Sequence, residues 1–267
     1  MRIFGVDAFA DEPFKGNPAI VCILDSIKPD SWMQSIASEL NNLSETAFVL
    51  KQTDDEFSLR WFTPKTEVNL CGHATLASAH ILWEEHILNI GDEVRFHTKS
   101  GLLTAKKNGN WIEMEFPARM IENATDYLEL NEAIGIKPIY TGRYSSPSGD
   151  IYLLEVESAT IVKRIKPNFE LLSSLNLFGV IVTSKSDQKD YDFISRFFAP
   201  AVGINEDPVT GSAHCYLAPY WGTKLNKRTM IGFQASERTG IIGCEWKGNM
   251  VILKGKAVTT FKGNLLV

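Results

Sequence analysis

The sequence lacks the features that mark several classes of protein. Its first residues include Asp7 and no long apolar segment, and no window approaches roughly eighteen uninterrupted apolar residues. We therefore expect no signal peptide and no membrane association, and we expect a cytoplasmic location. Neither a GxGxxG nor a GxxxxGK[ST] motif is present, so nothing in the sequence calls for a nucleotide or another cofactor.

Cysteine and histidine are scarce. The four cysteines form no CxxC pair, which predicts free thiols rather than a disulfide framework. The five histidines lack the spacing of a metal-binding pair, so we predict no metal site. The net charge is −5, and its charges are scattered rather than blocked, which argues against nucleic acid and anionic membranes as partners.

The chain has the length and apolar content of two small domains, with 267 residues and 44% hydrophobic side chains. Short apolar runs predict strands over Ile3–Ala8, Ala19–Leu24, Thr46–Leu50, Phe57–Phe62, Trp111–Phe116, Ile151–Val156, Val180–Thr183, Tyr191–Phe198 and Val251–Leu253. An amphipathic helix is predicted over Asp30–Leu43. Gly72–Glu85 is small or apolar on every side, which predicts a buried helix, and a similar helix begins near Gly211.

The two halves of the sequence repeat one motif. The segment RWFTP at Arg60–Pro64 is echoed by RFFAP at Arg196–Pro200. Each is followed by an acidic loop and then by a helix that opens Gly-x-Ala, at Gly72 and at Gly211. The repeat predicts two similar domains, 1–120 and 121–267, each a sheet curled around one buried helix, whose helix starts could face each other.

The two helix starts are candidate anion sites. Unpaired backbone N–H groups and the positive end of the helix dipole favour a carboxylate or phosphate there. The backbone of Gly72 and Ala74 in one half, and of Gly211 and Ser212 in the other, is therefore the candidate substrate-binding set. The alternative is that these glycines only begin tightly packed helices.

Three titratable residues lie close in sequence to these starts and are the candidate catalytic residues: Glu45, His73 and Asp207. Each also has an ordinary interpretation: Glu45 as an exposed charge, His73 as a capping residue and Asp207 as part of an Asp-Pro turn. We expect His73 to be neutral, because a helix N-terminus disfavours imidazolium.

Longer motifs around these residues carry a family resemblance. They are GNPA at Gly16–Ala19, NLSETAF at Asn42–Phe48, CGHATLA at Cys71–Ala77 and EDPVTGSAH at Glu206–His214. The sequence resembles the phenazine biosynthesis PhzF-like family of the diaminopimelate epimerase superfamily. The RWFTP and RFFAP segments and QASERTG at Gln234–Gly240 extend the match over nearly the whole chain.

The resemblance implies an α/β (α+β) fold of two pseudo-equivalent domains, each a barrel-like, mainly antiparallel sheet around a central helix. It also implies an active site in the cleft between them, and a homodimer. The residue matching the family's general acid/base is Glu45, and those lining the pocket are His73 and Asp207. Backbone groups at Gly72 and Ser212 would hold the substrate carboxylate.

We therefore predict a cofactor-independent isomerase that moves a proton on a small unsaturated, amino or hydroxy carboxylate. A two-base racemase or epimerase is the first alternative, with Cys71 as one base. In the repeat alignment, however, Thr210 occupies the position of Cys71, and Cys215 falls about one turn inside the helix. A non-catalytic carboxylate-binding or scaffold protein of the same fold is the second alternative.

Overall fold

The computed structural model describes residues 1–40 and 45–266, and the chain divides into two units. The first unit comprises Met1–Glu115 with Lys254–Val267, and the second comprises Phe116–Leu253. The predicted second domain, 121–267, differs from this division at its end. The last strand returns to the first unit, where it completes the sheet beside the N-terminal strand. A repeat in the sequence does not reveal such a return.

The first unit contains β1 (Arg2–Ala8), β2 (Asn17–Leu24), α1 (Asp30–Glu39), β3 (Thr46–Lys51), β4 (Glu56–Phe62), β5 (Glu67–Val68), α2 (Gly72–Glu84), β6 (Val94–Thr98), β7 (Gly101–Asn108), most of β8 (Trp111–Pro117) and β17 (Ala257–Asn264). The second contains β9 (Glu122–Asn123), α3 (Leu128–Ile134), β10 (Tyr140–Tyr144), β11 (Ile151–Glu155), α4 (Ala159–Arg164), α5 (Phe169–Ser174), β12 (Gly179–Lys185), β13 (Phe193–Phe198), the 3-10 turn η1 (Pro200–Val202), α6 (Gly211–Leu225), β14 (Thr229–Gln234), β15 (Gly240–Lys247) and most of β16 (Met250–Gly255).

The two sheets share one topology, as the repeat predicted. In the first unit β1–β2 is antiparallel, β2–β3 parallel, β3–β4 antiparallel, β4–β6 parallel and β6–β7 antiparallel. In the second unit β10–β11, β11–β12, β12–β13, β13–β14 and β14–β15 follow the same alternation. The parallel pairs are those that a helix connects, because parallel strands need a long crossover. Each sheet is thus mixed: the pairs connected by a helix are parallel, and the other pairs named here are antiparallel.

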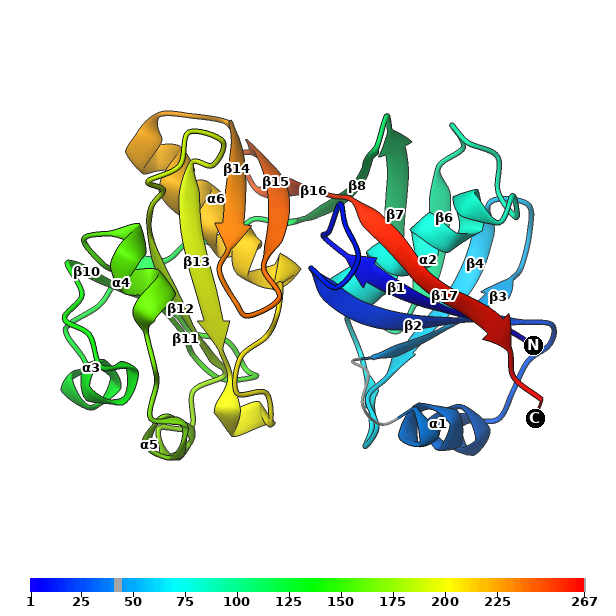
Figure 1. Ribbon diagram of the computed structural model, residues 1–267, viewed down its shortest axis with the longest axis horizontal. Helices are drawn as coiled ribbons and strands as arrows, with labels where there is room; N and C mark the ends of the chain where they lie inside the picture. The colour runs from blue at the N-terminus through cyan, green and yellow to red at the C-terminus, as the bar shows by residue number, and fades with distance from the viewer. Residues whose placement is uncertain (41–44, 267) are drawn as a thin grey trace. The chain divides into compact units, whose positions relative to one another are not determined.

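Helix α2 is the core of the first unit (Figure 1). Its side chains are buried on every side, from Ala74 to Trp83 apart from His80. The hydroxyls of Thr75 and Ser78 donate to the carbonyls of Cys71 and Ala74, both at 2.7 Å. This local pairing lets small polar residues be buried without an unsatisfied donor.

Helix α6 is the equivalent core helix of the second unit, although Pro219 lies inside it. A proline has no N–H, so the carbonyl of Cys215, four residues earlier, loses its helical partner. The backbone N–H of Arg119 donates to that carbonyl at 3.0 Å. A segment from outside the helix thereby replaces the missing hydrogen bond, and α6 continues to Leu225.

Shorter helices cover the outer side of each sheet. In the first unit Met33 and Ile36 of α1 form a buried cluster with Ile20 and Phe48. In the second unit the corresponding cluster joins α3, α4 and α5 to β12 and β13 through Leu130, Val162, Leu172, Val182 and Ile194. The central strands are consequently apolar on both faces, as sheets covered on both sides are.

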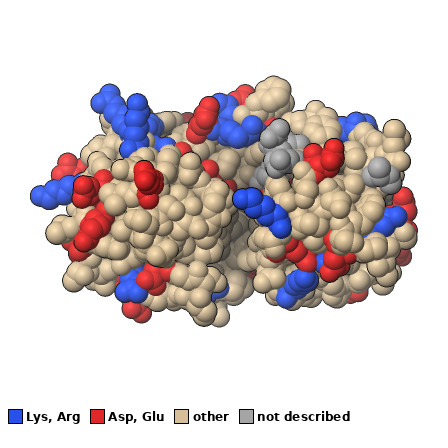
Figure 2. All heavy atoms as spheres, turned by 90° about the horizontal axis from the view of Figure 1, so that it is seen from below, with Lys and Arg blue, Asp and Glu red and all other residues tan. Residues whose placement is uncertain are grey.

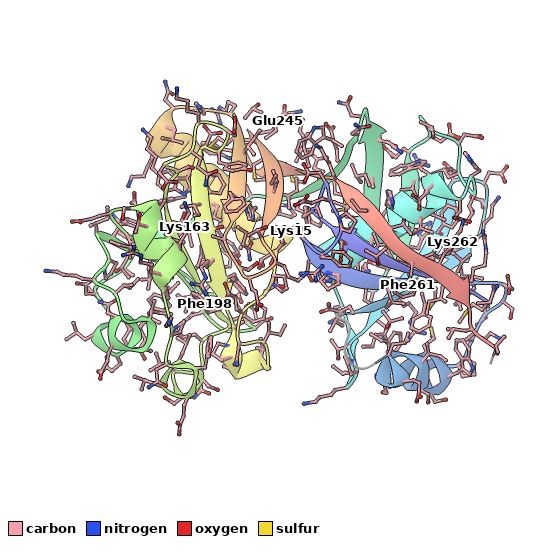
Figure 3. The ribbon with its side chains drawn as sticks, viewed as in Figure 1. Lys15, Lys163, Phe198, Glu245, Phe261 and Lys262 are labelled. Carbon is pink, nitrogen blue, oxygen red and sulfur yellow. The ribbon has the colours of Figure 1, made fainter. Side chains whose placement is uncertain are left out.

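The strand β17 carries little apolar pattern and lies against β1 (Figure 3). The ring of Phe261 lies where a Cβ on Gly5 would be, with its nearest atom 2.1 Å from that position. Glycine at this position of β1 thus permits the close approach of the aromatic ring.

Most predicted elements are confirmed to within a few residues, and the helix predicted over Asp30–Leu43 begins at Asp30 but ends at Glu39. Residues 41–43 of that prediction lie outside the described residues. The four cysteines are free thiols, as predicted, and all of them are buried. No helix within residues 1–40 and 45–266 has the length and apolar character that a membrane crossing needs. Lysine, arginine and acidic side chains are interspersed on the face that Figure 2 shows.

Candidate active site

The start of α2 is anchored by the arginine of the repeated motif. Arg60 on β4 makes a bidentate pair with Glu67, at 2.8 and 2.7 Å, and also pairs with Asp30 at 2.7 Å. Glu67 belongs to the segment that leads into Cys71, the N-cap of α2. The planar guanidinium thus ties the strand to the loop that presents the helix start.

The second unit repeats this anchor. Arg196 on β13 makes a bidentate pair with Glu206, both bonds at 2.7 Å, and donates to the carbonyl of Ile165 at 2.7 Å. Each arginine also lies over a phenylalanine two residues further along its strand, Phe62 and Phe198. The repeated sequence motif therefore corresponds to the same arginine–glutamate anchor in both units.

Glu45 and His73 come together at the start of α2. The Oε2 atom of Glu45 lies 3.1 Å from the Nε2 atom of His73. Both side chains are mostly buried, with exposed fractions of 16% and 10%. Glu45 immediately precedes β3, and its carbonyl accepts from the N–H of Ile20 at 3.1 Å, which fixes its backbone to β2.

Cys71 completes the cluster. Its sulfur lies 3.6 Å from Nδ1 and 3.7 Å from Nε2 of His73. Ligand atoms of Glu45, Cys71 and His73 all lie within 4.8 Å of one another. Glu45 belongs to one sequence motif, whereas Cys71 and His73 belong to another more than twenty residues later. The pairing of β2 with β3 brings Glu45 to the start of α2.

The prediction that His73 is neutral is wrong. Burial by itself lowers the pKa of His73, but the neighbouring Cys71 and the hydrogen-bonded carboxylate of Glu45 outweigh it and hold this pKa well above its usual value. An imidazolium beside a carboxylate is therefore the favoured state. The prediction considered only the helix end and did not place Glu45 beside the ring. Burial raises the pKa of the Cys71 thiol, an effect that His73 partly opposes.

Asp207 belongs to a different network, in the second unit. Its Oδ2 accepts from the hydroxyl of Thr210 at 2.6 Å, and its backbone N–H donates to the carbonyl of Phe197 at 3.1 Å. Gln234 connects the same loop, accepting from the N–H of Thr210 at 2.8 Å and donating to the carbonyl of Asp207 at 2.8 Å. Asp207 is thus held in a fixed orientation just before α6.

The backbone candidates differ in exposure. Gly72 is half-buried, and an added Cβ would meet no described atom within 4 Å, so its surroundings are open. Ala74 and Gly211 are buried, while Ser212 is exposed. Both helix starts follow an extended N-cap residue, Cys71 in α2 and Thr210 in α6.

Sequence reasoning did not assign Thr210 and Gln234 to the site. The repeat had placed Thr210 opposite Cys71, and Gln234 belongs to the QASERTG motif, but only the fold joins both to Asp207. Cys215 lies inside α6 and is buried, with its sulfur 3.9 Å from the carbonyl of Gly211. The repeat alignment had placed Cys215 about one turn inside the helix rather than at its start, and the structure agrees.

The duplicated units define the class of fold, an epimerase-like α/β fold of two similar units. A crystal structure of a probable proline racemase from Agrobacterium radiobacter matches with a TM-score of 0.66, covering 100% of this chain and 93% of that one. The two sequences are only 11% identical. This likeness concerns the fold, in agreement with the α/β architecture predicted.

The chain belongs to the family of phenazine biosynthesis-like proteins, whose model matches residues 6–263. An uncharacterized isomerase of Halalkalibacterium halodurans is 52% identical over 266 residues, which cover 99% of this chain and 98% of the relative. The crystal structure of a putative phenazine biosynthesis PhzC/PhzF protein from Clostridium difficile has a TM-score of 0.91 and 42% identity, with both chains covered completely. The protein is an isomerase of the PhzF-like type.

Proposed function

We propose that the protein is a cofactor-independent isomerase in which Glu45 moves a proton on a small carboxylate substrate. The observation that carries the proposal is the 3.1 Å contact between Glu45 and His73 at the start of α2. A carboxylate held in its ionised form beside the His73 imidazolium can remove a proton from carbon and return it. Membership of an isomerase family supports the same reaction class.

In the proposed reaction Glu45 takes a proton from a carbon next to an unsaturated or carbonyl-bearing group. It then returns the proton to another carbon on the same face, so one base suffices. His73 holds the Glu45 carboxylate in place, and the N–H groups at the start of α2 stabilise the charge that develops on the substrate.

The substrate carboxylate is proposed to bind backbone N–H groups at Gly72 and Ala74 or at Gly211 and Ser212. The open space around Gly72 supports the first of these positions. We propose that Asp207 positions the substrate, since a carboxylate fixed by Thr210 loses little freedom on binding.

Deuterium exchange tests the proposal. Wild-type protein is incubated in heavy water with a panel of cyclic and acyclic unsaturated amino and hydroxy acids. Incorporation of deuterium into each compound is followed by NMR. We expect Glu45→Gln to lower exchange about a hundredfold or more, as for loss of a general acid/base. The control is Glu39→Gln, which removes one negative charge from an exposed position in α1 and should leave exchange unchanged.

The same experiment separates the alternatives. Compounds that bind, as judged by chemical-shift changes, without exchanging in the wild type would overturn the isomerase proposal in favour of a carboxylate-binding protein. Exchange that survives Glu45→Gln but is lost in Cys71→Ser would favour the racemase chemistry. The expected homodimer stays a prediction, which light scattering on the purified protein would check.

A further inference from the structure

The cluster at the start of α2 combines three kinds of metal ligand. Glu45 offers a carboxylate oxygen, Cys71 a sulfur and His73 a ring nitrogen. The Nε2 atom of His73 lies 3.1 Å from Glu45 Oε2, and Cys71 Sγ lies at nearly equal distances from the two ring nitrogens, 3.6 Å from Nδ1 and 3.7 Å from Nε2. All three residues belong to the first unit.

These separations are close to those of a tetrahedral zinc site. Zinc bonds of about 2.3 Å to sulfur and about 2.0–2.2 Å to nitrogen and oxygen place neighbouring donors roughly 3.3–3.6 Å apart at tetrahedral angles. The observed separations of 3.1 and 3.7 Å bracket this range.

The donors are also held by the surrounding backbone. The carbonyl of Cys71 accepts from both the N–H and the hydroxyl of Thr75, at 3.1 and 2.7 Å. His73 lies in the first turn of a buried helix, and the Glu45 carbonyl is tied to Ile20. Such support lowers the cost of assembling a metal site.

We propose that Glu45, Cys71 and His73 form a binding site for a soft divalent transition-metal ion such as Zn²⁺, with a fourth position left for water. The ion displaces the Cys71 thiol proton and the proton between His73 and Glu45, and both protons pass to the buffer. Binding follows from the donor set alone. Its consequence, reversible inhibition, rests on the proposed role of Glu45, whose oxygen the metal would occupy.

The donor chemistry selects the ion. Thiolate and imidazole favour zinc, cobalt and related ions, whereas Mg²⁺ and Ca²⁺ prefer shells of six or more oxygens. We therefore expect a large excess of Mg²⁺ or Ca²⁺ to leave the site accessible to Zn²⁺.

Cobalt spectroscopy tests binding independently of activity. The full-length protein, first treated with chelator and kept reduced without air, is titrated with Co²⁺. We expect a thiolate-to-cobalt charge-transfer band, tetrahedral-type visible bands and saturation near one ion per chain. Zn²⁺ should displace the cobalt, because it binds such sites more tightly.

Variants assign the ligands. Cys71→Ser should abolish the charge-transfer band, and Glu45→Gln should weaken binding by more than the roughly tenfold to hundredfold typical of an outer-shell loss. The matched controls are Cys215→Ser, a buried thiol in α6, and Glu39→Gln, and both should bind as the wild type does. Far-ultraviolet circular dichroism confirms that each variant is folded.

Absence of the charge-transfer band in the wild type would overturn the metal site, and so would a band that persists in folded Cys71→Ser. With an exchanging substrate in hand, Zn²⁺ should also stop exchange and EDTA should restore it. Metal binding without inhibition would leave the site in place and count against Glu45 as the base. Exchange that depends on Glu45 in a protein that binds no metal would overturn the metal site and leave Glu45 as the base.

Discussion

Thr75 in α2 and His214 in α6 make the same contact in the two units. Each side chain donates to the carbonyl of the N-cap residue four positions earlier, from Thr75 to Cys71 at 2.7 Å and from His214 Nδ1 to Thr210 at 2.9 Å. A carbonyl oxygen can only accept, so the Nδ1 atom of His214 carries the proton. The residue four positions after the N-cap thus stabilises each helix start, through a hydroxyl in α2 and through an imidazole N–H in α6.

Burial of His214 predicts a loss of stability in acid. Burial lowers its pKa from 6.5 to about 4, although the hydrogen bond to Thr210 opposes the shift. Between these values the unfolded chain binds more protons than the native one, so the free energy of unfolding falls as the pH drops from about 6.5 toward about 4. The shift of this one histidine should lower the free energy of unfolding by about 3 kcal/mol between neutral pH and a pH below both pKa values.

Urea unfolding of the wild type and of His214→Gln at about pH 7 and about pH 4 measures this contribution. Carboxylates that titrate in the same window affect both proteins equally, so the difference between the two pH dependences isolates the histidine. Equal pH dependences would show that His214 does not titrate with a lowered pKa.

The arginine anchors should be sensitive to a change of side-chain shape. Arg196 is 11% exposed and Glu206 20% exposed, and their bidentate pair cannot be reproduced by a lysine. We expect Arg196→Lys to lower the free energy of unfolding by about 2 kcal/mol. Arg95→Lys is the control, since Arg95 is 47% exposed and its contacts are 3.7–4.0 Å, so its cost should be below about 1 kcal/mol. Similar small losses in both variants would contradict the anchor role.

Cys71→Ser should retain most of the exchange activity. The residue equivalent to Cys71 in α6 is Thr210, and Cys215 is buried within the helix, so the paired thiols of a two-base mechanism are not at equivalent helix starts. Exchange rates of the variant with the best substrate of the panel provide the measurement. A loss as large as that of Glu45→Gln would instead make the thiol an essential acid/base.

Gly72→Ala should separate substrate binding from stability. An added Cβ meets no described atom within 4 Å, and alanine favours a helix over glycine by roughly 0.5–1 kcal/mol. We expect an unchanged or slightly higher melting temperature but a raised KM, because the methyl group would obstruct approach to the backbone N–H groups.

Gly255→Ala is the contrasting control for that variant, since its Cβ would lie 2.5 Å from atoms of Leu76 and Phe9. It should lower the melting temperature. An unchanged KM in Gly72→Ala would argue against the α2 start as the carboxylate site.

Several strands could not be predicted because their residues carry little apolar pattern. β7 and β17 are largely exposed, and their place in the sheet depends on hydrogen bonds to neighbouring strands. Pro219 would ordinarily argue against a helix across Cys215–Leu225. The compensating N–H of Arg119 comes from a segment almost a hundred residues away in sequence, and no local rule predicts it.

The sequence by itself determined the duplicated architecture, the buried helices and the family. The reason is that apolar periodicity and repeated motifs are local properties of the chain. Only the tertiary structure decided what the candidate residues contact. Parallel pairing of β2 and β3 brings Glu45 to His73 and reverses the expected charge of the imidazole. A pKa and a set of metal ligands depend on distances through space, which spacing along the chain does not encode.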